Sequence, residues 1–228
     1  MAARTLEMLV DLQEPGWPLV RSWIDAANNA IEILPSDRAR AAEVLVAVQV
    51  GTRSTLGAVV WETGGLLVDD GWVRLLGGGG PRMIGDLASW NGLGPKPVCR
   101  TVPGLCVVAH DAAGGVFALD GGAIGPGRNA VYYLAPDTLR WMEIHRGYSH
   151  FLEWLCTGDV AGFSARVRWE GWETDVAVAG PDRAFAASPP RWTVEGRHSG
   201  RDALKSVPMP GLFHLQLELA RQMGPVPG

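Results

Sequence analysis

Between Trp61 and Trp141 of this 228-residue chain, short apolar runs alternate with glycine turns. Glycine pairs such as Gly64-Gly65 and Gly114-Gly115 separate runs that are rich in β-branched and aromatic residues. Runs of strand length between such turns are typical of strands joined by tight turns. The stretch therefore predicts a β-meander, with strands near 66–68, 72–76, 105–109, 116–119, 131–134 and 141–144.

Helical patterns precede the predicted meander. Pro18 suits the first turn of an amphipathic helix, because proline at that position loses no helical hydrogen bond. Ser36 is expected to cap an alanine-rich helix. Segment 55–62 fits a strand or a short helix by composition, and we interpret it as a helix that ends on a left-handed Gly64.

After the meander, the spacing of apolar residues becomes helical again. A stripe that includes Phe151 and Leu155 predicts one helix, and Asp159 can cap a second. Further helices are expected near 169–178 and 212–223, with irregular chain between them around Pro181, Pro189 and Pro190.

The order of elements is helices, meander and helices, with no internal repeat and no obvious linker. We interpret residues 1–228 as a single α+β domain. Its core is placed at about 15–157, and a helical C-terminal extension at about 158–223.

Charge and composition restrict the partners and the compartment. The formal net charge is -4 without a block of like charge, which argues against nucleic acid as a partner. No apolar run approaches the roughly 20 residues of a membrane-spanning helix, so no membrane partner is expected. Acidic residues at Glu7 and Asp11 interrupt any signal peptide, and the odd number of widely spaced cysteines favours reduced thiols. These features predict a cytoplasmic protein.

Motifs that carry chemistry are missing in their usual form. Gly77–Gly80 is followed by Pro81-Arg82 rather than by the Lys and Ser or Thr of a phosphate loop, so we interpret it as a turn. His145 and His150 are five residues apart, which is not the i, i+4 spacing of metal ligands on one helix. Cys99 lies near basic residues, but an incidental loop cysteine explains it. No catalytic residue, metal or cofactor is predicted.

His110 and Asp111 end one of the apolar runs, where catalytic pairs can lie. Adjacent residues of an extended chain point to opposite faces, so these two are not expected to form a dyad. Asp111 is instead expected to accept backbone N–H groups in the following turn. An alternative is a small-molecule-processing enzyme, in which His110, Asp111, His145 and His150 converge in space.

The ten tryptophans allow two interpretations. Most are expected in the core, because large aromatic residues dominate ordinary cores. The functional alternative is a non-enzymatic binding module, in which exposed Trp72, Tyr132 and Trp141 form a groove on the sheet for a protein partner. Acidic residues at its rim would steer a basic partner: Asp69, Asp70 and Glu143. A third hypothesis is self-association as a structural homodimer.

Four segments carry a resemblance to a known family: Glu62–Gly77, Gly115–Ala123, Val131–Trp141 and Tyr148–Trp154. They resemble a bacterial family of unknown function, domain-of-unknown-function family 2625. The likeness covers nearly the whole chain and implies no activity.

A more distant resemblance is to the SUKH superfamily of Smi1/Knr4-like proteins. Thr63-Gly64-Gly65, Gly114–Phe117 and Tyr148–Leu152 follow the order of its motifs. This resemblance implies a twisted, mostly antiparallel sheet flanked by helices. It also implies an immunity-protein-like role, in which the partner is a toxin. The long segment after about Gly158 departs from the superfamily, and no catalytic residue is carried over.

Overall fold

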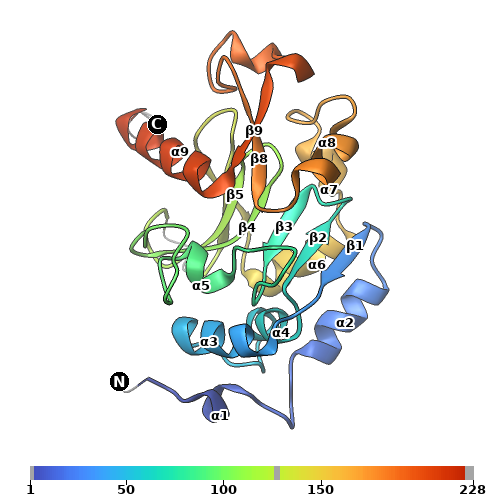
Figure 1. Ribbon diagram of the computed structural model, residues 1–228, viewed down its shortest axis with the longest axis vertical. Coiled ribbons are helices and arrows are strands. Elements are labelled where there is room, and N and C mark those ends of the chain that lie inside the picture. Colours follow the sequence, from blue (N-terminus) through green and yellow to red (C-terminus); the bar gives the residue numbers. More distant parts are fainter. Residues whose placement is uncertain (1–2, 126–128, 224–228) are drawn as a thin grey trace.

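The computed structural model describes residues 3–125 and 129–223. At its centre is a seven-stranded sheet, in which the strands are neighbours in chain order and each pair is antiparallel (Figure 1). The strands are β1 (Ile31–Leu34), β2 (Gly65–Val68), β3 (Val73–Leu76), β4 (Leu105–Asp111), β5 (Val116–Asp120), β6 (Val131–Leu134) and β7 (Trp141–His145). The predicted antiparallel meander and α+β class are confirmed.

Helices surround this sheet. They are α1 (Leu6–Leu9), α2 (Trp17–Asp25), α3 (Arg38–Val48), α4 (Thr55–Glu62), α5 (Leu87–Trp90), α6 (Tyr148–Thr157), α7 (Val160–Ser164), α8 (Trp172–Ala179) and α9 (Met209–Met223). The interpretation of segment 55–62 as a helix is confirmed. The buried apolar residues form one cluster that extends from Leu9 to Leu217.

Two predicted helix boundaries were wrong. Asp37, not Ser36, caps α3, since the Asp37 carboxylate accepts from the backbone N–H groups of Ala39 and Arg40. Helix α4 ends at an extended Thr63, and Gly64 does not have a left-handed conformation. Glycine is required there by a close approach, because a Cβ atom at Gly64 would lie 2.5 Å from the carbonyl oxygen of Pro35.

The C-terminal extension was predicted to be helical, but it also contains strands. It contains an antiparallel ribbon of β8 (Arg183–Ala187) and β9 (Leu204–Pro208). The prolines around this segment had suggested irregular chain, but tertiary hydrogen bonds order it. The Phe185 N–H donates to the carbonyl of Ala112 at 2.7 Å, and the Met209 N–H donates to that of Asp182 at 3.1 Å.

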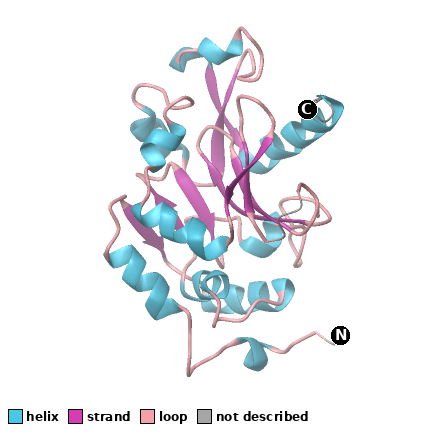
Figure 2. Cartoon of the chain, turned by 180° about the vertical axis from the view of Figure 1, so that it is seen from behind, coloured by secondary structure: helices cyan, strands magenta, loops and turns pink. Residues whose placement is uncertain are grey.

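Cross-strand pairing divides the sheet residues between two faces, because residues directly opposite each other point to the same side. One row on one face, which we call the extension face, consists of Glu32, Leu67, Arg74, His110, Val116, Leu134 and Trp141. On the other face, Phe117 packs against Phe151 of α6, with ring centroids 5.0 Å apart. Helix α6 lies behind the sheet in Figure 1 and in front of it in Figure 2.

Trp72, just before β3, lies at the centre of an aromatic cluster. Its ring centroid is 5.6 Å from that of Trp169 and 5.1 Å from that of Trp172, and the Arg168 guanidinium lies 4.8 Å from it. Trp72 is 0 % exposed. It therefore joins the sheet to the extension and cannot line an exposed groove, which corrects the prediction for this residue.

Replacing Trp72→Ala should lower the free energy of unfolding by about 3–5 kcal/mol, because the substitution opens a cavity in this cluster. Trp141→Ala, at a half-buried position, should lower it by less than about 2 kcal/mol. Urea denaturation of both variants measures the difference. Equal losses would contradict the assigned role of Trp72.

Candidate functional site

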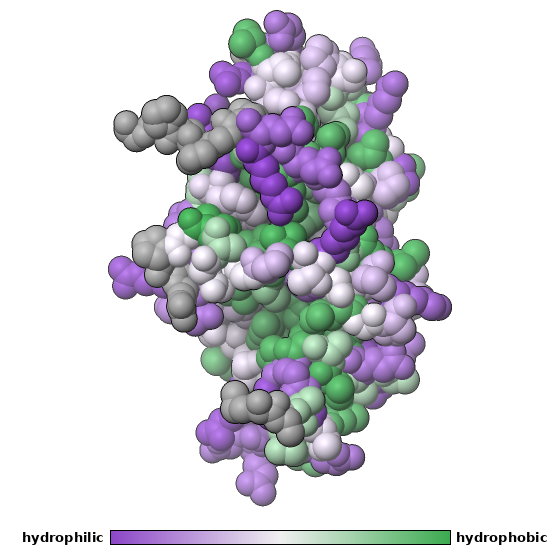
Figure 3. All heavy atoms as spheres, turned by 90° about the vertical axis from the view of Figure 1, so that its left-hand side faces the viewer, coloured by the Kyte–Doolittle hydropathy of each residue, from purple (hydrophilic) through white to green (hydrophobic). Residues whose placement is uncertain are grey.

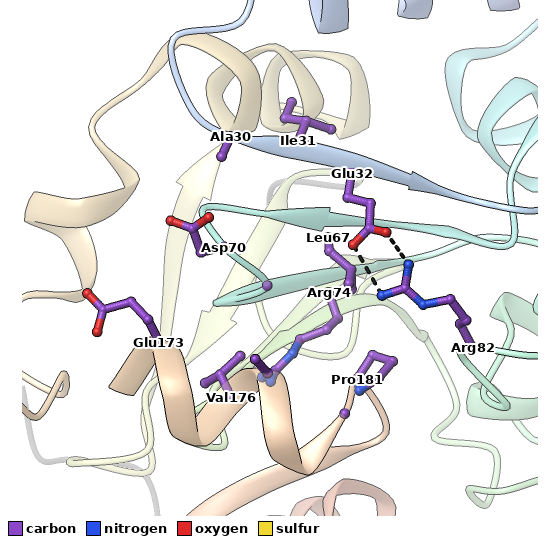
Figure 4. Close-up of a pocket in the computed structure, with 13 residues that line it drawn as sticks. Ala30, Ile31, Glu32, Leu67, Asp70, Arg74, Arg82, Glu173, Val176 and Pro181 are labelled. Carbon is purple, nitrogen blue, oxygen red and sulfur yellow. Dashed lines mark hydrogen bonds and ion pairs between the residues drawn. The ribbon is translucent and has the colours of Figure 1, made fainter. Parts of the chain in front are cut away.

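A cleft of about 550 Å³ lies between the sheet and α8 (Figure 4). Strands β1, β2 and β3 form one wall and α8 with the residues after it forms the other. The lining residues are Ala30, Ile31, Glu32, Leu67, Asp70, Gly71, Arg74, Arg82, Glu173, Val176, Ala177, Gly180 and Pro181. This volume is within the range of small-molecule sites, about 300–1,000 Å³.

Arg74 of β3 forms the floor of the cleft and is 0 % exposed. Its Nη1 donates to the carbonyl of Trp72 at 3.4 Å, which is long for a hydrogen bond. Within the described residues, Nε and Nη2 have no acceptor. These two nitrogens share one edge of the guanidinium, the edge that binds a carboxylate with two parallel hydrogen bonds.

The two carboxylates near Arg74 already accept hydrogen bonds from other groups. Asp111 accepts from the Tyr133 hydroxyl at 2.6 Å, and from two backbone N–H groups in its turn. Asp182 accepts from the N–H groups of Ile84 and Gly85, each at 2.8 Å. Burial lowers the pKa of Arg74 to about 10, with Asp111 and Asp182 opposing this shift, so Arg74 is charged at neutral pH.

His110 lies beside Arg74 on the extension face. The two residues are opposite each other in register, and the imidazole stacks on Trp90 with ring centroids 4.8 Å apart. Neither ring nitrogen has a hydrogen-bond partner in the described part of the chain. Burial, with the charge of Arg74, holds the pKa of His110 well below its usual value, so the ring is neutral.

An unpaired charge in a protein interior is destabilising by several kcal/mol unless another group compensates it. Arg74 and His110 together place four nitrogens without hydrogen-bond partners among the described residues on one face of the sheet. Polar interiors of this kind are common at functional sites, where a ligand supplies the missing partner. The arrangement can hold an anion at the floor of the cleft.

Charged side chains at the mouth of the cleft differ from one side to the other. Glu32 and Arg82 form an ion pair on one side, and Figure 4 shows them facing each other. Asp70 and Glu173 lie on the other side, and no ion pair among the described residues involves either of them. A ligand would therefore meet a cation at the floor and carboxylates at one side of the entrance.

Trp72 does not come together with Tyr132 and Trp141, the other two residues predicted to form an aromatic groove. Tyr132 is 6 % exposed, and its hydroxyl donates to Glu143 at 3.0 Å. Trp141 is half-buried and lines a separate groove of about 630 Å³. Tyr132 and Trp141 lie on β6 and β7, and strands β4 and β5 separate them from the turn before Trp72.

Two of the predicted rim carboxylates are bound within the chain. Asp69 forms an ion pair with Arg168, and Glu143 accepts from Tyr132. Asp70 is exposed and belongs to the Arg74 cleft. The predicted acidic rim is therefore divided between different parts of the molecule.

The alternative cluster of four titratable residues does not form either. As the sequence predicted, His110 and Asp111 point to opposite faces, and Asp111 accepts N–H groups in its turn. His145 is opposite Val131, at the other end of β7 from the row that contains His110. His150 lies on α6, which packs on the opposite face of the sheet from His110. The four side chains cannot act on one substrate.

Thiols and metal ligands give no further site. Burial raises the pKa of Cys99 to about 12, and that of Cys106 and of Cys156 to about 11. Such thiols stay protonated and unreactive at neutral pH. Residues 3–125 and 129–223 contain no group of three His, Cys, Asp or Glu side chains that could hold a metal ion.

Comparison with known proteins defines the class. The family model described as "Protein of unknown function DUF2625" matches residues 6–211. The chain is 39% identical over 189 residues to the "Putative uncharacterized protein YbfG" of Escherichia coli (strain K12), covering 83% of this chain and 86% of that protein. It is 34% identical over 186 residues to an "Uncharacterized protein" of Haemophilus influenzae (strain ATCC 51907 / DSM 11121 / KW20 / Rd), covering 82% of each.

The chain belongs to the DUF2625 family, as its sequence motifs predicted. Within the described ranges, the helices are too short or too polar to cross a membrane.

Arg74 was not among the site residues predicted from the sequence. The signal was a single arginine within the apolar run 72–76, which was itself predicted as a strand. A charged residue on a strand that is buried on both faces needs a partner, and none is evident nearby in the sequence. Its neighbour across the sheet, His110, is distant in the chain, so the pair could not be recognised before the register was known.

His110 should make stability depend on pH. Its folded pKa lies below the unfolded value of about 6.5, so below that pH the unfolded state binds the proton first. Above about pH 6.5 the ring is neutral in both states, and His110 does not change the free energy of unfolding with pH. Below that pH the free energy of unfolding falls by up to about 1.4 kcal/mol per pH unit.

Urea denaturation of the wild type and His110→Gln between about pH 7.5 and 5 tests this. The wild type should lose more stability on acidification than the variant, because all other titrating groups are shared. Parallel curves would show that His110 does not remain neutral in the folded protein.

Proposed function

We propose that this protein is a small-molecule binding protein, whose ligand places an anionic group on Arg74 in the cleft between the sheet and α8. The observation that carries the proposal is the free edge of the buried guanidinium, formed by Nε and Nη2. Two donors on one edge match the two oxygens of a carboxylate.

The charges at the entrance favour a ligand with a positive group as well. Asp70 and Glu173 attract a cation, while Arg74 attracts an anion. Ligands that combine both groups include amino acids and dipeptides. Their size is compatible with a cleft of about 550 Å³.

The side chains that line the cleft suit ligand binding better than they suit catalysis. The lining residues that could act as a nucleophile or a proton carrier are the carboxylates of Glu32, Asp70 and Glu173, and the lining includes no hydroxyl, thiol or imidazole side chain. Its charged groups can orient and neutralise a ligand, which is sufficient for recognition.

The substitution Arg74→Met should abolish ligand binding without destabilising the fold. Methionine fills a similar space without a charge, so the free energy of unfolding should stay unchanged or rise by up to about 4 kcal/mol. Ligand binding should be lost. Thermal-shift and calorimetric titrations with amino acids, dipeptides and simple carboxylates measure binding, since a ligand at 100 times its Kd stabilises by about 2.7 kcal/mol.

The matched control is Arg82→Met, which removes an arginine from the rim of the same cleft where Glu32 already pairs it. This variant should retain most of the affinity. The proposal is wrong if Arg74→Met binds the ligand as well as the wild type does, or if none of these anions stabilises the wild type.

A second candidate is the binding of a protein partner, with a SUKH-like or immunity-protein-like role. The supporting observation is the groove beside Trp141, whose apolar lining includes Leu105, Leu139 and Leu217. Figure 3 shows the face of the molecule that carries α5 and α9, where hydrophobic residues extend along the middle between hydrophilic ones. The charged residues of the groove are Arg140 and Arg221, which favour an acidic partner rather than the basic one predicted from sequence.

Trp141→Ala should abolish capture of such a partner in affinity pull-downs, because large aromatic side chains dominate protein interfaces. Met142→Ala is the matched control, since Met142 is exposed and adjacent but points to the opposite face of β7. Size-exclusion chromatography of the protein alone tests self-association. Equal capture by both variants would argue against the groove.

A further inference from the structure

A second basic cavity lies away from the Arg74 cleft and shares no residue with it. It measures about 390 Å³ and is lined by Asp137, Arg166, Val167, Arg191 and Arg197. Asp137 belongs to the turn between β6 and β7, Arg166 follows α7, and the other two arginines lie between β8 and β9. Two separate segments thus bring three guanidinium groups to one cavity, and a third segment brings one carboxylate.

Arg191 is the buried arginine of this cavity. It is 8 % exposed, and its Nε and Nη2 are buried without an acceptor in the described structure. Its guanidinium lies 5.8 Å from the ring centroid of Trp169, which belongs to the buried aromatic cluster. The side chain is therefore held by packing, while the edge that would bind an oxyanion has no protein partner.

The charges in the cavity do not balance. Asp137 is the single carboxylate among the lining residues, and its ion pair with Arg166 spans 3.7 Å with an Arg166 side chain that is 85% exposed. Such a pair is weak because water screens it. The nearby Asp111 already accepts from Tyr133 and from its own turn. The lining residues therefore carry about two net positive charges, which Asp111 offsets only in part.

We propose that this cavity binds a phosphate group, as inorganic phosphate or as a small phosphomonoester. A phosphate at neutral pH carries close to two negative charges and three strong acceptor oxygens, which suits converging guanidinium groups better than a carboxylate does. The cavity has about thirteen times the volume of a water molecule in the liquid, so it can also hold a small organic group on the phosphate.

The test is a titration of the full chain with inorganic phosphate and with glycerol 3-phosphate, followed by isothermal calorimetry and by 31P NMR. Sulfate and chloride at matched ionic strength are the controls for general salt effects. Arg191→Met should weaken phosphate binding by roughly ten- to a hundredfold, since hydrogen bonds between charged groups contribute that much. Tighter binding of glycerol 3-phosphate identifies an organic phosphate as the ligand, and equal binding identifies phosphate itself; both support the site.

Two further variants keep the test independent of folding and of the Arg74 cleft. Arg197→Gln changes an exposed side chain, so it should fold normally and weaken phosphate binding by several-fold. Arg74→Met should leave phosphate affinity unchanged, which distinguishes this site from the proposed function. The inference is overturned if the wild type does not bind phosphate or its monoester, if chloride produces the same response, or if Arg191→Met and Arg197→Gln both bind as tightly as the wild type.

Discussion

The cross-strand pair of Arg74 and His110 constrains how the rest of this molecule can pack. Both side chains point to the extension face, and both are fully buried there by segments outside their own strands. Trp90 stacks on His110, and α8 closes over Arg74. The C-terminal extension therefore does more than add apolar contacts, because it removes a cation from water, while the carboxylate that it brings near Arg74, that of Asp182, accepts from backbone N–H groups instead.

Asp111 connects the two basic sites electrostatically. Its negative charge raises the pKa of both Arg74 and Arg191, against the effect of burial. Its own oxygens accept hydrogen bonds from the Tyr133 hydroxyl and from backbone N–H groups. One buried carboxylate thus partly compensates two buried guanidinium groups. Each arginine keeps one hydrogen-bonding edge, formed by Nε and Nη2, without an acceptor among the described residues.

Local patterns predicted much of the fold but little of the site. The meander, the helix over 55–62 and the turn role of Asp111 follow from glycine spacing, side-chain periodicity and turn chemistry within a few residues. Trp72 was misjudged because its partners, Trp169 and Trp172, lie about a hundred residues away in the chain. The β8–β9 ribbon was missed for the same reason, since its order depends on contacts with the end of β4 and not on its own proline-rich sequence.

If the free edge of Arg74 serves a ligand, a crystal structure at high resolution should show that ligand. The protein would be purified without denaturation and crystallised without added carboxylate, phosphate or sulfate. The account predicts density for a bound oxyanion, with two oxygens about 2.7–2.9 Å from Nε and Nη2 of Arg74. Ordered water alone at these nitrogens, or a protein oxygen that accepts from both, would contradict it.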